Sequence, residues 1–126
     1  MQETMQGSYL RFYVTQGYRL HGVPLWDWLL HTANKMKIRG GSAFHAMAGF
    51  GHHHRMHEDR FIELGGSLIV EVEFIVTPDE KKRLLEVIAA EKIRLFYADI
   101  PATFGVLNPD RDDPGPGEGE KTPGPP

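Results

Sequence analysis

Four histidines lie within six residues of one another, at His52, His53, His54 and His57. Neutral imidazole is a ligand for zinc and copper, and on a strand His52 and His54 would lie on the same side. We therefore consider His52, His54 and His57 as candidate metal ligands. The simpler interpretation, which we favour, is a polar mobile loop whose charge changes between about pH 5 and 8.

A short glycine turn precedes the histidines. Gly49 and Gly51 flank Phe50, and glycines at such a place either allow close approach of a phosphate to the backbone or mark the bend at the end of a strand. Arg55 lies among the histidines, and its guanidinium suits bidentate binding of phosphate or carboxylate. The candidate ligand-binding residues here are Gly49, Phe50, Gly51 and Arg55.

A second candidate site is the start of a helix. Thr77 and Glu80 have the spacing of a capping box, and Pro78 between them suits the first helical position. Helix N-termini bind anions, and Lys81 and Lys82 follow directly. Thr77, Lys81 and Lys82 are therefore candidate ligand-binding residues.

The sequence offers little for catalysis. The chain has no cysteine, which excludes thiolate zinc sites, iron–sulfur clusters and a cysteine nucleophile, and it is consistent with a reducing cytoplasm. It also lacks a His-Glu-x-x-His motif, a Ser/His/Asp order and paired catalytic carboxylates. We expect a cytoplasmic protein that is not an enzyme.

Length and charge divide the 126 residues into one domain and a tail. We assign residues 1–105 to the domain and residues 106–126, which are rich in proline, glycine and acidic residues, to a disordered tail. The tail carries the whole net charge of −3, so the domain is neutral and lacks an electrostatic reason to bind nucleic acid. No uncharged stretch approaches the roughly 18 residues that span a bilayer, so we expect no direct membrane insertion.

Hydrophobic periodicity predicts four strands and two helices. Alternating apolar residues indicate strands at residues 8–15, 67–77 and 93–100, with Pro101 ending the last of these. Small and apolar residues at 42–51 indicate a further, buried strand that bends near Gly49. Helical spacing begins at Pro24 and runs to Met36, and a second helix begins at about Pro78.

The predicted order is βαββαβ. Right-handed crossovers then give an α+β, ferredoxin-like fold, in which a four-stranded antiparallel sheet carries both helices on one face. The other sheet face is left bare. Its predicted residues are too apolar for solvent and too charged for a core, which indicates a subunit interface: Tyr9, Arg11, Tyr13, Ile69, Glu71, Glu73, Ile75 and Tyr97.

The order of these segments resembles the PII-like proteins grouped as "domain of unknown function 190". The resemblance rests on LRFYV, HGVPLWDWLL, GGSAFHAMAGFGHHHRMHEDRFIEL and LIVEVEFIV, in that order. Its most specific part is the turn from Gly49 to Gly51 followed by His57. It covers residues 8–76, with looser similarity to about residue 107.

This resemblance implies a ferredoxin-like protomer that forms a homotrimer, with the bare sheet faces lining the centre. In the wider PII superfamily small effectors, often adenine nucleotides, bind in clefts between subunits and order a loop that engages a target transporter or enzyme. By position, the loop base is 49–51, the loop is about 52–66, and the second cleft wall is 76–82. The T-G-x-x-G-D-G-K phosphate loop of nitrogen-sensing PII proteins is absent.

The sequence thus leaves two functional hypotheses. The first is a PII-like signalling protein that binds a small anionic effector, such as an adenine nucleotide, between subunits. The alternative is a protein resembling the CutA metal-tolerance proteins, which share the trimeric architecture and here would bind zinc or copper through the histidine cluster.

Overall fold

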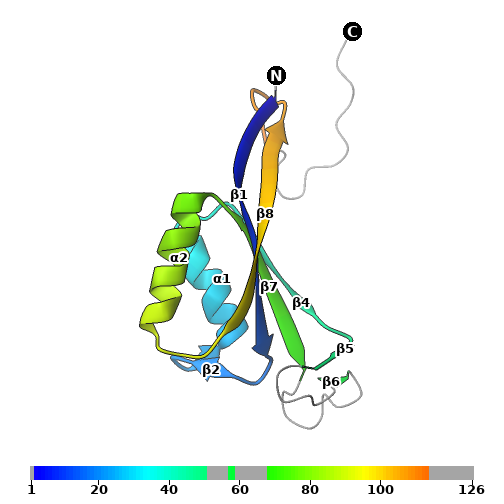
Figure 1. The fold of residues 1–126 in the computed structure, drawn as a ribbon, viewed down its shortest axis with the longest axis vertical. Coiled ribbons are helices and arrows are strands. Elements are labelled where there is room, and N and C mark those ends of the chain that lie inside the picture. The colour runs from blue at the N-terminus through cyan, green and yellow to red at the C-terminus, as the bar shows by residue number, and fades with distance from the viewer. Residues whose placement is uncertain (1, 51–56, 59–67, 114–126) are drawn as a thin grey trace.

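The computed structural model describes residues 2–50, 57–58 and 68–113 (Figure 1). The elements in chain order are β1 (Gln2–Thr15), β2 (Arg19–Leu20), β3 (Val23–Pro24), α1 (Leu25–Lys35), β4 (Gly41–His45), β5 (Ala48–Gly49), β6 (His57–Glu58), β7 (Ile69–Val76), α2 (Pro78–Ala90) and β8 (Phe96–Leu107). In this described part of the chain, no helix is long and apolar enough to cross a membrane.

The main sheet has four antiparallel strands in the order β4-β7-β1-β8. Both helices lie on one side of it, as Figure 1 shows. This is the ferredoxin-like arrangement, and it confirms the predicted α+β fold class. Two short ladders, β2 with β3 and β5 with β6, lie outside the main sheet.

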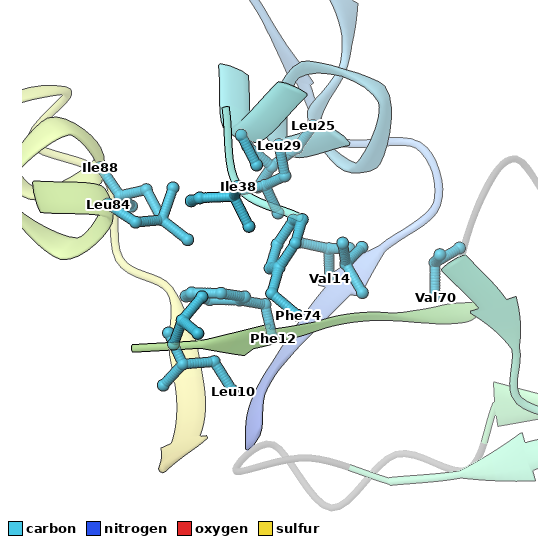
Figure 2. Packing of buried hydrophobic residues seen from close by; sticks show 13 residues of the cluster. Leu10, Phe12, Val14, Leu25, Leu29, Ile38, Val70, Phe74, Leu84 and Ile88 are labelled. Carbon is cyan, nitrogen blue, oxygen red and sulfur yellow. The ribbon is translucent and has the colours of Figure 1, made fainter. Parts of the chain in front are cut away.

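Alternation along the central strands builds the core. On β1, Leu10, Phe12 and Val14 are buried, and on β7 the predicted face of Val70, Val72, Phe74 and Val76 is buried. The helices cover this face with Leu25, Leu29 and Ala33 from α1 and Leu84 and Ile88 from α2. Figure 2 shows Phe12 and Phe74 of the sheet facing Leu84, Ile88 and Leu29 of the helices. Burial of apolar area, at about 25 cal/mol per Å², is the main stabilising contribution here.

The starts of the two helices follow local sequence signals. Pro24 is the N-cap of α1, so the helix begins at Leu25, one residue after the predicted position. α2 begins at Pro78 as predicted, and its capping box is complete. The Glu80 N–H donates to Thr77 Oγ1 at 3.2 Å, and the Thr77 N–H donates to a Glu80 carboxylate oxygen at 2.8 Å.

Two strands are longer than periodicity predicts. β1 begins at Gln2 rather than near Ser8, and β8 continues through Pro101 to Leu107, so the prediction that Pro101 ends the strand is wrong. β8 is an edge strand, where the N–H that proline lacks can face away from the partner. The last residues of β8 thus lie in the segment assigned to the tail, and residues 114–126 lie outside the described residues.

The segment predicted as a buried strand at residues 42–51 is also different. It forms the edge strand β4 and then the separate β5, and Phe44 and Met47 are exposed. The prediction that this segment is buried within the protomer is therefore wrong, although it contains small apolar residues.

The bare sheet face is present, but Tyr97 does not lie on it. In the antiparallel register Tyr97 is opposite the buried Phe12, with ring centroids 5.8 Å apart, so both lie on the helix side. Phe96, opposite Tyr13, takes the place predicted for Tyr97. We call this face the open face; register with Tyr9, Arg11 and Tyr13 places on it Phe96, Ala98, Ile100, Ile69, Glu71, Glu73, Ile75, Ser42 and Phe44.

Candidate functional site

The predicted loop base is a short antiparallel ladder. Gly49 of β5 pairs with His57 of β6, and Ala48 pairs with Glu58, so Gly49 and His57 lie side by side. A Cβ added to Gly49 would lie 3.0 Å from Ile69 Cδ1, which places this ladder against the start of β7. Gly49 does not have a positive φ, so close packing is the feature that its lack of a side chain serves here.

Most of the predicted loop residues lie outside the described residues. These are Gly51, His52, His54 and Arg55, and for His57 the structure describes the backbone pairing alone. Phe50, at the edge of this segment, is 61% exposed. Among the residues that the structure describes, no three His, Cys, Asp or Glu side chains come together as a metal site.

The second predicted site, at the start of α2, is already rich in contacts. Lys81 Nζ lies 2.9 Å from Asp99 Oδ2 on β8, whereas Lys82 is exposed and has no ion pair within the described part. Hydrogen bonds from Ser8 and Lys81 lower the pKa of Asp99 below its usual range. An anion bound here would therefore meet Lys82 freely and Lys81 only in competition with Asp99.

The two candidate sites lie at opposite ends of β7. Gly49 contacts Ile69 at the first residue of the strand, and Thr77 follows Val76 at its last. An eight-residue strand is roughly 25 Å long, which exceeds the reach of a small ligand. Within one chain the structure does not bring the two predicted walls together.

The open face carries a compact charged cluster among aromatic rings. Arg11 Nε lies 3.1 Å from Glu73 Oε1 and 3.5 Å from Glu71 Oε1, and the guanidinium carbon is 5.4 Å from the ring centroid of Tyr9. Hydrogen bonding to Glu73 raises the pKa of Tyr9, and Arg11 opposes this effect. Two carboxylates share one guanidinium, so the cluster has an excess negative charge at neutral pH.

Comparison with known proteins places the chain in a family. The profile of the domain of unknown function 190, described as "Uncharacterized ACR", matches residues 7–93. The chain belongs to the DUF190 family. It is also similar to a "UPF0166 protein" of Aquifex aeolicus (strain VF5), at 32% identity over 77 residues, which cover 61% of this chain and 73% of that protein.

The DUF190 match extends from β1 through α2 and ends before β8. Three residues of β8 have roles that the sequence did not predict. Asp99 pairs with Lys81, and Phe96 and Ile100 complete the open face. The signal that would identify them is the register of β8 on β1, which sequence alternation alone does not fix.

Proposed function

We propose that this DUF190 chain is a non-enzymatic regulatory protein of the PII-like type. It binds a small anionic effector, an adenine nucleotide in the first instance, in clefts between the subunits of a homotrimer. It then engages a target transporter or enzyme through residues 52–66. The observation that carries this proposal is the separation of the loop base and the α2 start at opposite ends of β7.

This separation favours a site between subunits. If Gly49 and Thr77 both contact one effector, the second residue must come from another copy, because one chain keeps them roughly 25 Å apart. The open face supplies a reason for copies to associate, since Tyr9, Tyr13 and Phe96 gather there and neither α1 nor α2 covers them. An effector in such a cleft would stabilise the assembly and the loop together.

The charges at the α2 start favour an anion that carries only a few negative charges. The helix N-terminus and Lys82 attract negative charge, whereas Asp79 and Glu80 in the first turn oppose a large excess of it. Asp79 is partly neutralised by Arg83, whose Nε lies 3.0 Å from its Oδ2. These contacts are consistent with a nucleotide whose phosphate lies near Lys82.

The test is thermal unfolding of the full chain with ATP, ADP, AMP and cyclic AMP, and separately with zinc. A nucleotide at a hundred times its dissociation constant adds about 2.7 kcal/mol, which raises the Tm of a domain of this size by several degrees. Lys82→Gln should weaken the nucleotide effect. The matched control Lys92→Gln, in the turn just past the C-terminal end of α2, should leave it unchanged.

Each other outcome has a clear meaning. A monomer in light scattering together with no nucleotide effect would contradict the proposal. A response to zinc alone, lost when His52, His54 and His57 are replaced, would instead assign the chain to the metal-binding alternative.

A further inference from the structure

A cavity of about 300 Å³ lies between the C-terminal half of α1, the turn that follows it and the sheet. Its apolar floor comes from Leu30 and Ala33 of α1, Ile38 of the turn and Phe74 of β7. In Figure 2 Phe74 points from β7 into the helix layer, where Ile38 lies. Neither the loop base nor the α2 start contributes to it, so this cavity is separate from the site proposed above.

Two glycines, Gly40 and Gly41, line the cavity. A Cβ on Gly41 would overlap the ring of Phe74, so glycine at the start of β4 lets this ring reach the cavity wall. A Cβ on Gly40 would meet nothing within 4 Å, which places open space beside that residue. The turn between α1 and β4 passes through Lys37, whose φ of 63° is the left-handed conformation common just past the end of a helix.

The rim of the cavity is polar and carries positive charge. His31 uses Nδ1 for Asp27, at 2.9 Å from Oδ1, which leaves Nε2 as the ring nitrogen for a ligand. Arg39 lies with its guanidinium carbon 5.7 Å from the ring centroid of Phe104 and one nitrogen 3.8 Å from Met5 Sδ. Neither of these neighbours is an anion, and no carboxylate in the described ranges forms an ion pair with Arg39.

We infer that this cavity binds a small organic anion with a flat apolar body. The body would lie against the partly exposed Leu30, above the nearly buried side chains of Ile38 and Phe74, and a carboxylate or phosphate group would meet Arg39. Pockets of this size with an apolar floor and a few polar groups are typical of small-molecule sites. The planar guanidinium suits bidentate contact with such an anion.

The experiment uses the full chain labelled with ¹⁵N and two probes with the same ring system and similar size, 2-naphthoate and the uncharged 2-naphthalenemethanol. Amide chemical shifts locate binding, and calorimetry gives its strength. We expect shifts at residues 30–41 and 74. Naphthoate should bind about tenfold or more tightly than the alcohol, as one charged contact provides.

Two variants test the assignment of residues. Arg39→Gln should weaken naphthoate binding about tenfold and leave the alcohol unchanged, whereas the control Arg94→Gln, an exposed site before β8, should change neither. Gly40→Leu should block both probes, because its side chain enters the open space beside residue 40. Its thermal unfolding, compared with wild type, shows whether the fold is retained.

Shifts confined to the open face, or equal behaviour of Arg39→Gln and Arg94→Gln, would overturn the inference. Nucleotide binding at the α2 start is measured separately through Lys82→Gln. If binding is absent at one of the two sites, the measurement at the other site can therefore still be interpreted.

Discussion

At the scale of single residues, electrostatic roles in this protein depend on contacts between distant strands. Asp99 on β8 receives Lys81 from α2, and Arg11 on β1 lies between two carboxylates of β7. Solvent-exposed ion pairs contribute little to stability individually, with a median near 0–1 kcal/mol, and the pairs here are only partly buried. Their main effect is that a charged side chain already held in an ion pair is less available to bind a ligand or a partner.

Asp99 gives a pH-dependent prediction. Its pKa is lower in the folded protein than in the unfolded chain, so the ionised carboxylate stabilises the fold above the unfolded pKa of about 3.9. This contribution is lost as the pH falls through the folded pKa. Asp99→Asn should therefore unfold more easily than wild type at pH 7, and the difference should vanish at strongly acidic pH.

Denaturant unfolding between pH 7 and pH 2 measures this difference. Asp110→Asn, an exposed site beyond β8, is the control and should show a smaller pH dependence. A difference for Asp99→Asn that is the same at every pH would rule out the electrostatic origin.

Thr77 gives a second prediction at this scale. Replacing it with alanine removes the side-chain half of the α2 capping box and leaves the Glu80 N–H without its partner. We expect a loss of about 1 kcal/mol in the free energy of unfolding. Thermal unfolding should show a Tm several degrees lower, while Thr103→Ala on the exposed side of β8 should change it less.

At the scale of elements, Gly7 marks where β1 separates from β7. The last pair between these strands is Ser8 with Val76, and beyond it β1 and β8 continue as a two-stranded ribbon that projects from the body (Figure 1). A Cβ on Gly7 would overlap the carbonyl oxygen of Val76, which is backbone and has little freedom to move. Because glycine has no side chain, β1 can pass close to the Val76 carbonyl at the point where it leaves β7.

Gly7→Ala should therefore destabilise the protein by about 1–3 kcal/mol, the range for overpacking. The matched control is Gly40→Ala, where a Cβ meets nothing within 4 Å and where we expect little change or a small gain. Chemical denaturation of both variants measures the effect. Equal stability of the two would show that the β1 ribbon shifts to accept the methyl group.

At the scale of the whole molecule, we expect the open face to be the surface through which copies of the chain associate. One side of the sheet is covered by helices, and the other carries aromatic side chains around Arg11. Phe96 is 65% exposed on the isolated chain and lies 5.5 Å from Tyr13 between ring centroids. Association through this face would bury these rings.

Phe96→Glu should prevent that association, because a buried unpaired carboxylate is costly. Light scattering should give about three times 14.3 kDa for wild type and a single protomer for the variant, with a retained circular dichroism spectrum. Val87→Glu, at an exposed position of α2, should remain trimeric. A monomeric wild-type protein would contradict the predicted trimer.

The sequence by itself determines the features that depend on neighbours along the chain. Alternation in β1 and β7 predicts which side chains are buried, and the Thr77 to Glu80 spacing predicts the start of α2, because both signals are local. Together with the periodicity of the other segments they predict the βαββαβ order and, from it, the ferredoxin-like fold. The resemblance carried by the glycine turn and its surroundings also led to the DUF190 family.

The tertiary structure decides what depends on pairing between distant segments. Alternation shows that Phe96 and Tyr97 lie on opposite faces, but the register on β1 determines which face each one takes. Pairing likewise extends β8 past Pro101, brings Asp99 to Lys81 and places the two predicted ligand sites at opposite ends of β7. These outcomes depend on how strands separated by many residues align, and no local pattern encodes that alignment.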